Sequence, residues 1–72
     1  MSQYYIHKDR PGILYRETRG NWKFSGLNAR AKGKWLNLAV IIKAGGERQP
    51  AELIKEGILQ RIDRIDAKLM ML

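Results

Sequence analysis

A glycine between two segments of alternating apolar and polar residues constrains the fold of this chain of 72 residues more than any other feature. The segment is Arg19-Gly20-Asn21-Trp22. Glycine at the first central position of a two-residue turn permits type II′ geometry, whose twist matches the strands of a β-hairpin. We therefore expect a hairpin in which Arg19 lies opposite Trp22, and a fold that contains an antiparallel sheet.

The period of two along a strand assigns the hairpin residues to two faces. The aromatic face contains Ile13, Tyr15, Glu17, Arg19, Trp22 and Phe24. The other face contains Leu14, Arg16, Thr18, Lys23 and Ser25. We expect the aromatic face to form the core, and the face that carries Arg16 and Lys23 to contact solvent or a ligand.

Other turn and strand signals surround this hairpin. A strand is expected over residues 3–8, followed by a type II turn at Pro11-Gly12, because proline presets φ at the second position and glycine accepts a positive φ at the third. Residues 34–43 fit two structures. Their β-branched run favours a strand after a turn at Lys32-Gly33, whereas apolar residues at helical spacing favour a helix that ends at Gly45-Gly46.

The last third of the chain has a helical pattern over residues 50–70. Pro50 suits a first helical turn, Glu52 complements the helix dipole, and apolar residues recur at spacings of three and four. These apolar residues are Ile54, Ile58, Ile62, Ile65 and Leu69. Within such a helix Gly57 costs about 1 kcal/mol relative to alanine.

The length of 72 residues and the absence of cysteine indicate one small reduced domain over residues 1–72 with a single core. The expected fold class is α+β, with a small antiparallel sheet of three or four strands and a C-terminal amphipathic helix packed on one face. The alternative, if residues 34–43 are helical, is a three-stranded sheet followed by a helical hairpin.

The net charge of +7 and all the aromatic residues fall within residues 1–43, whereas basic and acidic residues balance in residues 44–72. A concentrated positive charge favours a polyanionic partner, so we expect a non-enzymatic accessory protein that binds nucleic acid, DNA or RNA, or a nucleoprotein through a basic sheet face and its loops. The expected contacts are Arg10, Arg16, Lys23, Arg30, Lys32, Lys34 and Trp35. Tyr5 and Trp35 are the aromatic residues expected to be exposed for stacking.

Catalytic and cofactor signatures are weak in this sequence. It has no cysteine, a single histidine, His7, and no glycine-rich phosphate loop. We therefore expect no enzyme activity, no metal and no cofactor. The start of the chain lacks the pattern of a secretory signal, and the longest apolar run, residues 38–42, is short, so a cytoplasmic protein is expected and membrane attachment is not.

A second interpretation is a protein-interaction module, an inhibitor or adaptor that docks on an acidic surface of a larger protein with Trp35 as its anchor. A homodimer is a further alternative, because part of the predicted helix carries a heptad-like stripe. That stripe contains Ile58, Ile62, Ile65 and Leu69. The sequence leaves the choice between duplex and single strand open.

Overall fold

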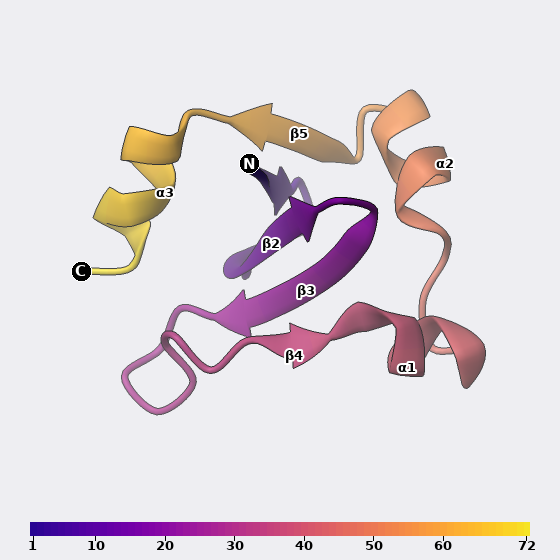
Figure 1. Cartoon of the computed structure of the whole chain (residues 1–72), viewed down its shortest axis with the longest axis horizontal. Coiled ribbons are helices and arrows are strands. Elements are labelled where there is room, and N and C mark those ends of the chain that lie inside the picture. Colours follow the sequence, from indigo (N-terminus) through magenta and orange to yellow (C-terminus); the bar gives the residue numbers. More distant parts are fainter.

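The computed structural model describes residues 1–72 as a five-stranded antiparallel sheet with three short helices (Figure 1). The strands are β1 (Ser2–His7), β2 (Arg10–Thr18), β3 (Asn21–Gly26), β4 (Leu36–Asn37) and β5 (Leu59–Ile62). The helices are α1 (Leu38–Lys43), α2 (Pro50–Lys55) and α3 (Arg64–Met70). The strand order is β4-β3-β2-β1-β5. The predicted α+β class is confirmed, with five strands in place of three or four.

The hairpin of β2 and β3 forms, but its turn lies one residue earlier than predicted. Arg19 and Gly20 are the two central residues, with φ of 51° and 83°, which is the pattern of a type I′ turn. Glu17 consequently lies opposite Trp22, and the predicted pairing of Arg19 with Trp22 is wrong. The pairing moves by two residues, and an even shift leaves the paired side chains of both strands on their predicted faces. Arg19, predicted on the aromatic face, instead lies in the turn and lines a hollow on the opposite face.

The turn between β1 and β2 is also displaced. It lies at Lys8 and Asp9, where the backbone N–H of Asp9 donates to Nδ1 of His7 at 3.0 Å. The predicted type II turn at residues 11–12 is therefore wrong. Those residues lie in an irregularity of β2, because the register shifts between Ile6 and His7. A proline cannot donate to the ladder, which explains why Pro11 is found where pairing is interrupted.

Of the two structures that residues 34–43 fit, the strand is favoured by their β-branched run, and the structure corrects it. Only β4 is extended, and the helical alternative holds from residue 38 onward as α1. The side chain of Asn37 begins the helix by accepting the backbone N–H of Ala39 at 3.0 Å. Gly45 ends it with a φ of 80°, and the N–H of Gly46 donates to the carbonyl of Ile41 at 2.9 Å.

The helix predicted over residues 50–70 is replaced by α2, β5 and α3. Gly57 has a φ of 76°, and the N–H of Ile58 donates to the carbonyl of Leu53 at 2.8 Å. This is a Schellman-type ending, so Gly57 stops the helix where the spacing pattern predicted that it continued. The following residues pair with β1, with Tyr4 opposite Ile62.

The stripe proposed for a homodimer is divided in the same way. Ile58 precedes β5, Ile62 ends β5, and Ile65 and Leu69 lie in α3 with exposures of 72% and 60%. The four residues do not form one helical face. None of the helices is both long enough and apolar enough to cross a lipid bilayer.

The two faces of the sheet are covered by different helices. On the aromatic face, called the core face below, Tyr5 and Tyr15 form a buried cluster with residues from α1, α2 and β5, namely Leu38, Leu53 and Leu59. Trp22 and Phe24 pack against this cluster, which confirms that the aromatic face forms the core. In Figure 1, α1 and α2 lie at the right of the sheet and α3 lies at the left.

The opposite face is called the basic face, and its side chains come from alternate positions of β1, β2 and β3. It carries Ser2, Tyr4, Arg16, Thr18, Asn21 and Lys23. The same face also carries Ile6, Leu14 and Ser25, and the last two are fully buried rather than in contact with solvent or a ligand as predicted. Helix α3 packs against β1, and its buried residue Ala67 lines one hollow together with Tyr4 and Arg16. The C-terminal helix therefore covers part of the basic face, whereas the predicted longer helix was expected to lie over the aromatic core.

Candidate nucleic-acid interface

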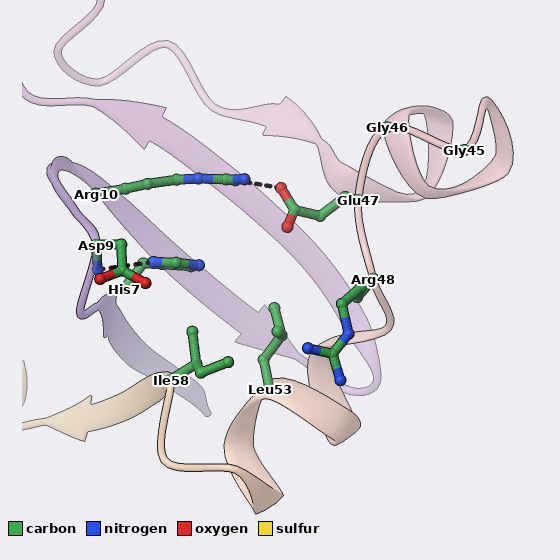
Figure 2. Close-up of a pocket in the computed structure, with 9 residues that line it drawn as sticks. All are labelled: His7, Asp9, Arg10, Gly45, Gly46, Glu47, Arg48, Leu53 and Ile58. Carbon is green, nitrogen blue, oxygen red and sulfur yellow. Dashed lines mark hydrogen bonds and ion pairs between the residues drawn. The ribbon is translucent and has the colours of Figure 1, made fainter.

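A hollow on the core side contains charges of both signs (Figure 2). It has a volume of about 360 Å³, and Arg10 and Glu47 meet across it in an ion pair. Nη1 of Arg10 also donates to the hydroxyl of Tyr15 at 3.3 Å. The bond to Glu47 is the main reason why the pKa of Arg10 is raised. Arg10, predicted to bind a partner, instead ties the connection between α1 and α2 to the sheet.

Several other ionisable groups in and beside this hollow have partners. Arg48 forms ion pairs with Glu52 of α2 and with Glu56, the residue that follows α2. These bonds, that to Glu56 first, raise the pKa of Arg48. Burial raises the pKa of Tyr15, and the hydrogen bond from Arg10 only partly opposes this. His7 is 8% exposed, and its Nδ1 accepts the turn N–H. Both arginines of this hollow are paired and the carboxylate of Asp9 also lines it, so the hollow does not favour a phosphate.

The basic face has a second hollow, of about 370 Å³, that is lined only by polar side chains. They are Ser2, Arg16, Thr18, Arg19, Asn21 and Lys23. Arg16 and Lys23 are direct neighbours across the β2–β3 ladder, and none of the cations here forms an ion pair with a carboxylate. Adjacent unpaired cations and hydroxyl donors suit a phosphate group, which accepts several charge-assisted hydrogen bonds.

A third hollow, of about 380 Å³, lies between the sheet and α3. It is an aromatic and aliphatic groove, lined by Tyr4, Arg16, Trp35, Ala67, Lys68, Met71 and Leu72. The guanidinium of Arg16 lies over the indole of Trp35, with Cζ 4.1 Å from the ring centroid. The rings of Tyr4 and Trp35 are 6.4 Å apart between centroids and tilted by 53°. Arg16 thus lines both the polar hollow and this groove.

The loop over residues 27–35 carries the densest group of predicted contacts and is held against the sheet. The side chain of Asn28 accepts the N–H groups of Arg30 and Ala31 at 3.0 and 2.8 Å. The buried hydroxyl of Ser25 accepts the N–H of Gly33 at 3.1 Å. These bonds give the loop a defined conformation that ends with Trp35 on the basic face.

The three cations of this loop are free of carboxylates but face different surroundings. Arg30 and Lys34 line a shallow hollow of about 590 Å³ beside β3. Lys32 donates to the backbone oxygen of Leu72 beyond α3. The loop therefore presents two cations to solvent at its own surface, and the third lies toward the groove.

The structure brings together Arg16, Lys23 and Trp35 and separates Arg10 from them. Tyr5, predicted to be exposed, is 8% exposed in the core, and Tyr4 occupies the expected stacking position. Sequence reasoning also missed several polar lining residues: Ser2, Thr18, Arg19, Asn21 and Lys68. The pairing of β1 with β2, which no local motif encodes, places the first two of them side by side.

No group of histidine, aspartate and glutamate side chains is arranged to hold a metal ion. No protein-family model, curated protein or solved structure matches this chain.

Proposed function

We propose that this protein is a non-enzymatic accessory factor that binds nucleic acid through its basic face and the loop over residues 27–35. The observation that carries the proposal is the grouping of three cations without a carboxylate partner, Arg16, Arg19 and Lys23, in the polar hollow of the basic face. Every ion pair in the chain involves Arg10 or Arg48 and lies beside α2 or the α1–α2 connection. The cations of the basic face, its hairpin turn and the loop have no carboxylate partner: Arg16, Arg19, Lys23, Arg30, Lys32 and Lys34.

An extended polyanion fits this arrangement better than one small anion does. The unpaired cations are distributed over the end of the β2–β3 hairpin and over the loop, and they line separate hollows. A phosphate backbone places one negative charge on every nucleotide, so successive phosphates reach separate cations. Binding of this kind releases counterions and weakens steeply as salt increases.

The alternative of a protein partner uses Trp35 as a protruding anchor. In the structure Trp35 is half-buried, with the guanidinium of Arg16 over its ring. A half-buried ring does not protrude as a docking anchor would, which supports the nucleic-acid proposal. A protein dock would also be lost on Trp35→Ala and would tolerate the loss of single rim charges.

The test is fluorescence anisotropy with a labelled oligonucleotide of about 20 nucleotides, as single strand and duplex and as DNA and RNA, over a range of salt concentrations. We expect binding at low salt whose logarithm falls linearly with the logarithm of salt concentration. Replacing Arg30, Lys32 and Lys34 by glutamine, singly, should reduce the steepness of that slope by about one in each variant, because each side chain neutralises one phosphate. Lys55→Gln, on α2 at the core side, is the matched control and should leave the slope unchanged. Absence of binding to every oligonucleotide at low salt would refute the proposal.

A further inference from the structure

Arg16 stands at the junction of two hollows with different chemistry. The polar hollow has no apolar lining residue, whereas the groove beside it is lined mostly by aromatic and aliphatic side chains. Because Arg16 lines both, a ligand that occupies the two at once carries an anionic group directly beside a flat apolar group. A nucleotide within a nucleic-acid strand has this arrangement.

We propose that the basic face binds a single-stranded nucleic acid, with a phosphate in the polar hollow and the adjoining base in the groove of Tyr4 and Trp35. This inference rests on the proposed function and specifies its ligand. It commits to the single strand because a base in a duplex has both faces covered by its neighbours. A base in a single strand can leave the stack and lie on an aromatic side chain.

The phosphate position is supported by the charges of the polar hollow. Arg16 and Lys23 are cross-strand neighbours, and Arg19 follows at the hairpin turn. The hydroxyls of Ser2 and Thr18 bond to each other at 2.6 Å, so one of the two keeps a free O–H to donate to a phosphate. No carboxylate lines this hollow, so nothing within it competes with an anion.

The base position is supported by the lining of the groove. Tyr4 and Trp35 supply two rings, and Ala67, Met71 and Leu72 supply aliphatic surface on the side of α3. The guanidinium of Arg16 is already held over the indole, and a guanidinium plane also stacks on bases. Lys68 supplies a second cation in the groove, where it is suited to the next phosphate.

The first test needs no variant. Anisotropy is measured for three forms of one labelled oligonucleotide at the same salt concentration: the single strand, its duplex, and a single strand in which abasic sites replace the bases. DNA and RNA versions are used for each form. We expect the single strand to bind at least about tenfold more tightly than either the duplex or the abasic strand, given the strength of base stacking on aromatic residues.

The second test locates the base. Tyr4→Leu and Trp35→Leu should each weaken binding of the intact single strand by about tenfold while the affinity for the abasic strand stays unchanged. Val40→Ala, which shortens an exposed apolar residue on α1, is the control and should change neither affinity. Circular dichroism establishes that each variant is folded.

The outcomes separate this inference from the function on which it rests. If the duplex and the abasic strand bind as tightly as the intact single strand, the single-strand inference is wrong and general nucleic-acid binding stands. If none of the forms binds at low salt, both proposals fail. A preference between DNA and RNA with the same order of the three forms supports the inference and identifies the sugar that is recognised.

Discussion

The guanidinium of Arg16 lies over the indole ring of Trp35, and this contact joins strand β2 to the end of the loop over residues 27–35. A cation over an indole face is attracted by the negative face of the ring. The contact orders two long side chains that would otherwise be free at the surface. It therefore presents a charge and a ring to a ligand as one prearranged unit.

Substitution of Arg16 on the basic face and of Arg10 on the core side removes the same charge from two places, so comparing the two variants tests where the interface lies. Arg16→Gln should weaken oligonucleotide binding by about tenfold, because it removes a charge-assisted hydrogen bond to phosphate. Arg10→Gln removes the same charge on the core side, where Arg10 is already paired with Glu47, and should change affinity by less than about twofold. Anisotropy at one fixed salt concentration measures both. Equal losses in the two variants would show that binding depends on net charge alone.

The substitution Gly57→Ala distinguishes a helix that continues through residue 57 from one that ends there. It should stabilise the protein in the first case and destabilise it in the second. In a continuous helix, Gly57→Ala would stabilise the protein by about 1 kcal/mol. Gly57 has a φ of 76°, and no heavy atom lies within 4 Å of the place that a Cβ would occupy, so the cost is purely conformational. We expect destabilisation of about 1 kcal/mol. The free energy of unfolding in urea measures the difference, and an increase in stability would contradict the helix ending at this residue.

Gly26 tests the position of the loop. A Cβ at Gly26 would lie 2.7 Å from the Cβ of Ala31, and neither atom can move without the backbone. Gly26→Ala should therefore displace the loop, lower stability in urea and weaken oligonucleotide binding. The double variant Gly26→Ala with Ala31→Gly removes the clash and should recover most of the binding. A single variant that binds as tightly as the wild type would show that the loop position is irrelevant to the interface.

Ionisation of the buried Tyr15 is expected to lower the free energy of unfolding at alkaline pH. Burial raises its pKa above the ordinary value of 10.0, so below that pH the phenol is neutral in both the folded and the unfolded chain. As the pH rises above 10.0 the unfolded chain loses the proton first, and the free energy of unfolding decreases until the folded phenol also ionises. Urea unfolding between about pH 8 and 11 should show a steeper decrease for the wild type than for Tyr15→Phe. Parallel decreases would show that other groups set the limit.

The faces of the hairpin could be predicted from the sequence although its register could not. Side chains alternate with a period of two, and the predicted and observed pairings differ by two residues. Tyr15 and Phe24 therefore lie in the core in either register, and Arg16 and Lys23 lie opposite. The choice between a turn at Gly20-Asn21 and one at Arg19-Gly20 depends on whether Arg19 adopts a positive φ, which the local sequence leaves open.

The C-terminal third was mispredicted for a physical reason. Apolar residues at spacings of three and four are typical of an amphipathic helix, but the same residues serve a helix end, a strand and a second helix here. The deciding contacts are distant in sequence, because Leu59 pairs with His7 of β1. Gly57 was the one residue in this segment whose type indicated that the helix could end there. A glycine before a β-branched residue indicates a helix end as readily as a tolerated interior position.

The pairing of β1 with β5 also determines the order in which the chain can assemble. Strands β1, β2 and β3 follow one another through short turns, so their contacts are local and can form early. The outer edge of β1 is completed only when β5 arrives from the far end of the chain. A chain that has not yet acquired β5 therefore exposes the unpaired backbone of β1, which is an edge open to association with other strands during synthesis.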